Sequence, residues 1–155
     1  MRRFLMTLLL LGSLSAASAS DAATGHIVKM LPLFLDLKGH DALSPSLFDR
    51  DAYQVHLRQY TNEVSAIRFD VLWRASNVKD AKLTLRLELR GVGPDNLPRQ
   101  ATLEQTVTPH FFRHWTSFTL GGDDYKNFGE VVAWRATLWS DDKMLGEQKS
   151  FLWRT

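Results

Sequence analysis

The strongest constraint on the fold is a two-residue alternation of apolar and polar side chains in the middle of the chain. It runs from Ile67 to Arg74 and again from Leu83 to Arg90. Successive side chains of a strand point to opposite faces of a sheet, so this period places one face in a core and the other in water. The apolar residues of an amphipathic helix recur every three or four positions instead. The two segments therefore predict antiparallel strands with one wet face.

Five further segments have the composition of strands. The first begins at His26, and Pro32, which cannot donate a hydrogen bond to a neighbouring strand, places it at the edge of a sheet. Glycine, proline and aspartate are frequent between the later strands, which span residues 101–107, 115–120, 131–139 and 144–153. Seven strands at a spacing of roughly ten residues predict an all-β fold, a two-sheet antiparallel sandwich.

One segment between the first and second strands has helical periodicity. Phe48, Ala52 and Val55 recur at the spacing of a single helical face, and two serines just before them can cap the first turn. The pattern predicts one short helix over Leu47–Gln59. We expect its apolar face to pack over an end of the sheets. The segment 121–129 is expected to be a turn.

The N-terminus has the three-part pattern of a cleavable secretory signal peptide. Two arginines precede an apolar run, and small residues follow it. Ala17-Ser18-Ala19 predicts cleavage after Ala19, with cleavage after Ala17 as the alternative. The apolar run is about half as long as a bilayer span requires, so no membrane anchor is expected after cleavage.

This pattern also defines the domain organisation. Residues 1–19 form the signal peptide, residues 20–25 a flexible leader, and residues 26–155 a single sandwich domain. We expect an exported protein that is periplasmic or extracellular.

The net charge and the absence of cysteine argue against nucleic-acid binding and exclude cysteine-based chemistry. The chain carries 19 lysines and arginines against 17 aspartates and glutamates, and loss of Arg2 and Arg3 with the leader makes the domain formally neutral. A neutral domain lacks the concentrated basic face that nucleic-acid binding requires. The chain has no cysteine, which excludes disulfides, thiolate metal ligands and a thiol nucleophile.

The strand order, the Trp73 strand and the tight turn between the Trp134 strand and the last strand resemble an immunoglobulin or fibronectin type III-like sandwich. The resemblance covers about His26 to Trp153 and implies the seven-stranded, two-sheet plan. The helix between the first two strands and the lack of the antibody-type disulfide depart from that family. The end of the chain, from Ala133 onward, is also similar to small uncharacterised exported proteins of bacteria, from which no function transfers.

The register of the last hairpin decides which of its side chains face outward. A two-residue loop at Asp141–Asp142 pairs Leu138 with Leu145, whereas a three-residue loop that includes Lys143 shifts the pairing by one residue. The three-residue loop keeps every charge away from the face of Trp134, so it is the preferred register. A shift of one residue reverses the two faces.

In the preferred register the outward face carries four candidate ligand-binding residues, Trp139, Phe151, Trp153 and Arg135. Flat aromatic rings beside charged groups can stack on sugar rings or enter a pocket of a protein partner. The alternative is that the helix or the first strand covers these rings and adds them to the core. Large exposed apolar patches are uncommon on monomers, which favours that alternative.

His110 and His114 are weak candidates for metal ligands. Their spacing of four residues would direct both imidazoles at one metal on a helix, but Pro109 and the strand-forming residues that follow predict an extended backbone. A third ligand would have to come from elsewhere in the fold, from His40, Asp41 or His56.

Together these patterns predict an exported, non-catalytic binding or interaction module with an unknown protein or glycan partner. No hydrolase elbow, phosphate-binding loop or zinc-protease motif occurs in the sequence, so neither a cofactor nor catalysis is expected. A carbohydrate-binding module that uses exposed Trp and Phe is the alternative. A metal-dependent enzyme built on the two histidines is a less favoured third hypothesis.

Overall fold

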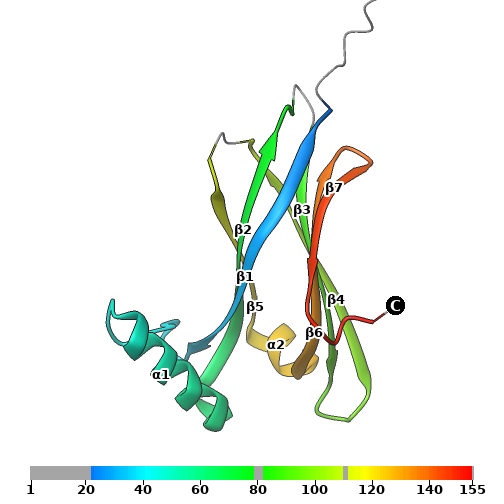
Figure 1. The fold of residues 1–155 in the computed structure, drawn as a ribbon. Coiled ribbons are helices and arrows are strands. Elements are labelled where there is room, and N and C mark those ends of the chain that lie inside the picture. The colour runs from blue at the N-terminus through cyan, green and yellow to red at the C-terminus, as the bar shows by residue number, and fades with distance from the viewer. Residues whose placement is uncertain (1–21, 79–81, 110–111, 155) are drawn as a thin grey trace, which may run out of the picture.

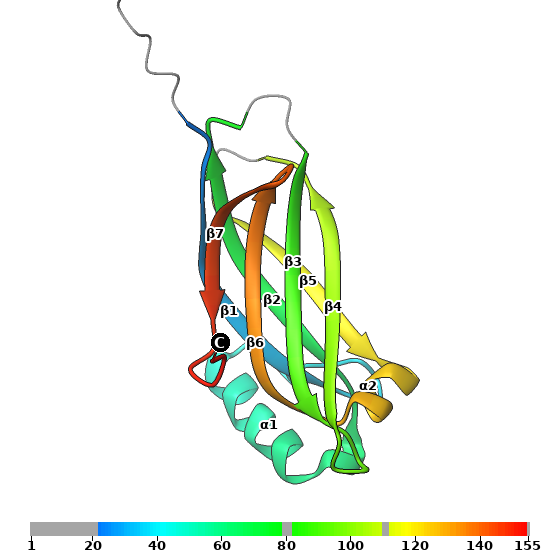
Figure 2. The same ribbon diagram turned by 90° about the vertical axis from the view of Figure 1, so that its right-hand side faces the viewer.

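Two antiparallel sheets face each other in the computed structural model, which describes residues 22–78, 82–109 and 112–154 (Figures 1 and 2). The three-stranded sheet has the order β1-β2-β5, with β1 at Thr24–Asp36, β2 at Val64–Ser76 and β5 at His114–Gly121. The four-stranded sheet has the order β4-β3-β6-β7, with β3 at Leu83–Val92, β4 at Pro98–Val107, β6 at Glu130–Ser140 and β7 at Lys143–Lys149. The expected seven-stranded sandwich is confirmed, and it is compatible with an immunoglobulin-like fold. The expected signal peptide lies outside the described residues.

The core lies between the sheets and is built from the alternating residues of the two central strands. The inward side chains of β2 and β3 are buried, and they are Ile67, Phe69, Val71, Trp73, Ala75, Leu83, Leu85, Leu87 and Leu89. The indole N–H of Trp73 donates to the hydroxyl of Thr116 at 2.9 Å, which satisfies its one buried polar group. Burial of each large side chain stabilises the fold by about 1.5 to 3 kcal/mol.

The first strand lies at an edge, as Pro32 predicts, and a helix closes part of that edge. Helix α1 spans Leu47–Gln59 as expected, and the hydroxyl of Ser46 caps its N-terminus. Gln54 is only 4% exposed. Its side-chain carbonyl accepts from the N–H of Phe34 at 2.8 Å, and its amide donates to the carbonyls of Phe34 and Asp41 at 2.9 Å each. One side chain thus satisfies backbone groups that an open strand edge leaves unpaired.

The expected orientation of α1 is wrong. The helix buries Gln54 and Leu57, whereas Phe48, Ala52 and Val55, which were expected to pack inward, are exposed. The hydrogen bonds of Gln54 to the edge of β1 determine which face of the helix turns inward. The apolar stripe is therefore held on the outer side of the molecule.

The segment expected to be a turn after β5 is a second helix. Helix α2 spans Gly122–Phe128, and a short 3₁₀ helix, η1, spans Thr61–Glu63. Phe128 is buried in the core. Gly129 ends α2 with a φ of 76°, and a Cβ there would lie 2.3 Å from the carbonyl oxygen of Val92. Only glycine allows this close approach of α2 to the end of β3.

The final hairpin combines features of both registers that the sequence allowed. Its turn has two residues, Asp141 and Asp142, but a register shift follows between Leu138 and Trp139. Beyond that shift the strands follow the preferred register, so the face assignment of β6 is right and the predicted loop length is wrong. The extra residue, Leu145, packs against the core instead of facing outward.

The two ends of the sandwich differ. The β6–β7 turn and the start of β1 lie at one end, and α1, α2 and η1 lie at the other, here called the helical end (Figures 1 and 2). Within the described ranges, none of the helices is both long and apolar enough to cross a bilayer.

Candidate binding surfaces

Trp139 lies on the outward face of the four-stranded sheet and is partly exposed. The guanidinium of Arg86 lies 5.1 Å from the centre of its ring, and its indole N–H donates to the hydroxyl of Thr137 at 2.8 Å. Arg86 also pairs with Glu104 on β4. The ring is therefore held by a cation and a hydrogen bond within its own sheet.

Trp153 is only 8% exposed although it lies outside the main core cluster. The guanidinium of Arg90 lies 4.0 Å from the centre of its ring and also donates to the carbonyl of Arg154 at 2.8 Å. The backbone N–H of Trp153 donates to the carbonyl of Ser150, and this turn brings the end of the chain back against the sheet. The cover that the structure shows for this ring is the guanidinium of Arg90, whereas the sequence suggested the helix or the first strand.

Phe151 and Arg135 have different surroundings. Phe151 is 86% exposed, with the guanidinium of Arg154 at 5.9 Å from its ring. Arg135 pairs with Glu147 at 2.6 Å and with Glu88 at 3.4 Å.

These candidate residues do not form a continuous aromatic platform. The arginines against the two tryptophans, Arg86 and Arg90, are four residues apart on β3, or about 13 Å along a strand. Arg135 and its carboxylate partners occupy the sheet between them, since Arg135 lies opposite Glu88. Each tryptophan is therefore a separate local feature.

The two candidate metal ligands cannot be compared directly, because His110 lies outside the described residues. His114 starts β5, and its ring meets that of Trp73 edge to face at 6.0 Å. His40 and His56, suggested as further ligands, pair with Asp36 and Glu63 near α1. Among the residues with a described position, no three His, Asp or Glu side chains converge as a metal site would require.

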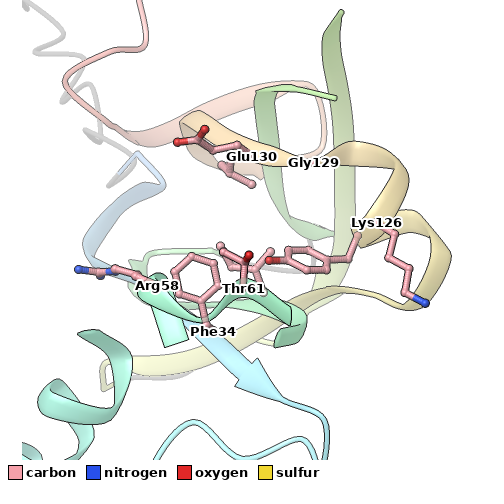
Figure 3. A pocket seen from close by; sticks show the side chains of 9 residues that line it. Phe34, Arg58, Thr61, Lys126, Gly129 and Glu130 are labelled. Atoms are coloured by element: carbon pink, nitrogen blue, oxygen red, sulfur yellow. The ribbon is translucent and has the colours of Figure 1, made fainter. Parts of the chain in front are cut away.

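A pocket of about 700 Å³ opens between the two sheets at the helical end (Figure 3). Its apolar walls come from both sheets and from α2, and they are Phe34, Ile67, Tyr125 and Val131. Its polar rim consists of Arg58, Thr61, Lys126 and Glu130, with Gly129 beside them. Arg58 and Lys126 extend to opposite sides, with Phe34 and Thr61 between them.

The charged groups of this rim are available to a ligand. Within the described part of the chain, no ion pair or hydrogen bond engages the side chains of Arg58, Lys126 or Glu130. Burial raises the pKa of Tyr125 above its ordinary value of 10.0, so its hydroxyl is a protonated donor at neutral pH. The pocket thus combines an apolar interior with two free cations, one carboxylate and one phenol.

The sequence did not reveal this pocket, because its lining comes from six elements far apart in the chain. Phe34, Ile67 and Val131 have the pattern of ordinary core residues, and α2 was expected to be a turn. The one sequence signal for it is the pair Tyr125 and Phe128 in the segment 121–129, since aromatic residues are unusual in an exposed turn.

Comparisons with known proteins identify no relative of this chain. No family model matches the chain, and neither the curated proteins nor the solved structures contain a significant match. The functional argument therefore rests on the geometry of the chain itself.

Proposed function

We propose that this chain is exported and acts as a non-catalytic binding module, with the pocket between the sheets as its ligand site. The observation that carries the proposal is the 700 Å³ pocket with an apolar interior and an unpaired polar rim. Pockets of about 300 to 1,000 Å³ that combine apolar walls with a few polar groups are the usual sites for small ligands.

The lining favours a small amphipathic molecule with an aromatic or aliphatic body and an acidic group. Phe34, Ile67 and Val131 provide apolar surface for the body. Arg58 and Lys126 can attract the acidic group, and the hydroxyl of Tyr125 can donate to it. Glu130 disfavours ligands with several negative charges.

We further propose that the sandwich is of the fibronectin type III-like kind. In a constant-type immunoglobulin sandwich, the fourth strand lies in the sheet of the first, second and fifth strands. Here β4 pairs with β3 instead. Sandwiches host many functions, so this architecture is compatible with a binding module without requiring one.

The geometry gives less support to the carbohydrate-binding alternative. Sugar stacking needs open aromatic faces, but Trp153 is buried and Arg86 lies against one side of Trp139. A glycan-array signal that disappears in Trp139→Ala would favour this alternative over the pocket.

The pocket can be tested with 8-anilinonaphthalene-1-sulfonate, a fluorescent probe with an aromatic body and one anionic group. We expect saturable binding of one probe per chain. Val131→Trp fills the pocket and should weaken binding by at least about tenfold, while Lys126→Glu should weaken it about fivefold by repelling the sulfonate. Thermal melting monitors the fold of each variant.

Phe48→Asp provides the control, because it removes exposed apolar surface on α1 and leaves the pocket intact. We expect its affinity for the probe to equal that of the wild type. Binding that survives Val131→Trp but disappears in Phe48→Asp would exclude the pocket as the site.

A further inference from the structure

The outer face of α1 is an apolar surface that the pocket does not use. It consists of residues from the helix and the loop before it, namely Leu43, Phe48, Ala52 and Val55. Phe48 is 82% exposed and Leu43 is 73% exposed. Clustered exposed side chains of this size on a soluble domain indicate an interaction surface.

This surface is fixed in its outward position. Phe48, Ala52 and Val55 form a stripe along one side of α1, while Gln54 and Leu57 hold the opposite side against the sandwich. Rotation of the helix to bury the stripe would break all three hydrogen bonds of Gln54. Helix α1 also projects beyond the sheets, which leaves its outer side open to a partner (Figure 1).

The surface offers both a projection and a hollow. Phe48 projects at one end of the stripe, and a shallow groove of about 440 Å³ runs beside it. The groove is lined by Leu43, Ser44, Asp49, Ala52, Tyr53 and His56. A face that carries both features can be complementary to itself under twofold symmetry, where each copy supplies what the other accepts.

The charges along α1 favour a second copy in the antiparallel direction. Asp49, Arg50 and Asp51 lie near the N-terminal end of the helix, where the guanidinium of Arg50 pairs with Asp51 at 3.0 Å and the three side chains sum to one negative charge. Arg58 lies in the last turn and has no ion pair among the described residues, whereas His56, in the same turn, pairs with Glu63. An antiparallel pair brings the acidic end of each helix to the basic end of the other. A parallel pair places Asp51 beside Asp51 and Arg58 beside Arg58, which repel each other.

From this pattern we infer that two copies of the chain associate through the outer faces of their α1 helices, packed antiparallel with the crossing near Val55, which brings Asp51 of each copy to the height of Arg58 of the other. A helix of 13 residues is about 20 Å long, so the interface is smaller than the roughly 800 Å² per partner of a stable complex. The dimer is therefore weak and reversible, with a dissociation constant at or above the micromolar end of the range for standard-size interfaces.

Analytical ultracentrifugation of the purified protein tests this inference over about 1 to 500 µM. The wild type should change reversibly from monomer to dimer. Phe48→Asp should weaken the dimer by at least about twentyfold, because it places a charge in the apolar stripe. Phe151→Asp is the matched control, since Phe151 is 86% exposed on a different surface and its replacement should leave the dissociation constant unchanged.

The antiparallel direction has its own test. Asp51→Arg and Arg58→Asp should each weaken the dimer by about fivefold, and the double variant should restore it. Asp51 and Arg58 are two turns apart on one helix, too far to interact, so a rescue must come from the partner copy. No ligand is added, so a contribution of Arg58 to the pocket does not affect this measurement.

Three results would overturn the inference. The first is a monomer at the highest concentration, and the second is a dimer that Phe48→Asp does not weaken. The third is a monomeric protein that sediments with vesicles of phosphatidylcholine and phosphatidylglycerol through Phe48, which would assign the face to a membrane surface. None of these results bears on the pocket, whose probe binding is measured separately.

Discussion

Large apolar side chains are covered on the outer face of the four-stranded sheet but exposed on the outer face of α1. On the sheet, Trp153 is 8% exposed beneath Arg90, while on the helix Phe48 is 82% exposed. Trp153 lies in the tail after β7, which ends at Lys149, and this tail lies against the sheet where the long side chain of Arg90 on β3 reaches the ring. A helix held by one face at a sheet edge has no such neighbours on its other face. The neighbours of an aromatic residue decide whether its ring is exposed to a partner, so they indicate binding better than the number of aromatic residues on a surface does.

The largest expected effect is the difference in free energy of unfolding between variants of these two aromatic residues. Trp153→Ala should lower the free energy of unfolding by about 3 kcal/mol, because it removes a buried ring and uncovers the sheet. Phe48→Ala should change it by less than about 0.5 kcal/mol, since the ring is already in water. Chemical denaturation measures both values. Equal losses in the two variants would contradict the assignment of one ring to cover and the other to solvent.

The hydrogen bonds of Gln54 attach α1 to the edge of β1 and so keep its apolar stripe exposed. Gln54→Leu tests how much these hydrogen bonds contribute to stability. Leucine keeps much of the volume but leaves the N–H and carbonyl of Phe34 unpaired, so we expect a loss of about 2 to 3 kcal/mol. Hydrogen exchange should show faster exchange of the Phe34 amide. Gln59→Leu, at an exposed position of the same helix, is the control and should have little effect on either measurement.

A smaller effect, which depends on pH, comes from the contact of Tyr53 with Asp36. The hydroxyl of Tyr53 donates to the carboxylate of Asp36 at 2.9 Å. Burial acts to raise the pKa of Asp36, but hydrogen bonds from the His40 N–H, the Tyr53 hydroxyl and the Lys38 N–H outweigh it and lower the pKa below 3.8. Stability from this carboxylate is therefore present above pH 3.8 and is lost as the pH falls through the lower folded-state pKa.

Tyr53→Phe should accordingly cost about 1.5 kcal/mol at pH 7, and its difference from the wild type should shrink below pH 3.8. Urea denaturation at several pH values gives this difference. Tyr60→Phe, whose ring contacts only that of His56 among the described contacts, should be neutral throughout. A constant difference across the acid range would show that Asp36 is not the partner that matters.

The smallest effect concerns the partial cover of Trp139. Arg86→Met keeps the aliphatic stem but removes the guanidinium, so we expect a loss of about 0.5 to 1 kcal/mol. Acrylamide, a neutral quencher, should quench tryptophan fluorescence more strongly in this variant. Arg99→Met removes an arginine that pairs with Asp95 and should leave quenching unchanged.

Much of the fold was predictable because local patterns encode it. The alternation around Trp73 and in β3 gave the correct inward faces, and Pro32 correctly placed β1 at an edge. Helix α2 was not predicted, because seven residues are too few to show an apolar stripe. The displaced position of Leu145 was also missed, since a bulge reverses side-chain faces without any signal in the alternation of its strand.

The candidate site was less predictable than the fold. Trp139 and Arg135 lie on the outward face of β6, but β7 ends at Lys149, so Phe151 and Trp153 lie in a tail after the hairpin and not on the expected strand. The cover of the two tryptophans depends on Arg86 and Arg90 from another strand. The pocket depends on the distance between two sheets and on helices that close one end, which no single segment encodes.

The sequence by itself determined the period of each strand, the position of α1 and the composition of the core, because steric preferences of the backbone and burial of apolar side chains act over a few residues. Tertiary structure alone decided which way α1 faces. Gln54 bonds with Phe34, twenty residues earlier in the chain, and these long-range hydrogen bonds outweigh the preference of Phe48 and Val55 for burial. Three backbone groups paired by Gln54, at about 1 to 3 kcal/mol each if left unpaired, together with the full burial of Leu57 on the same face, outweigh the exposure of Phe48 and Val55.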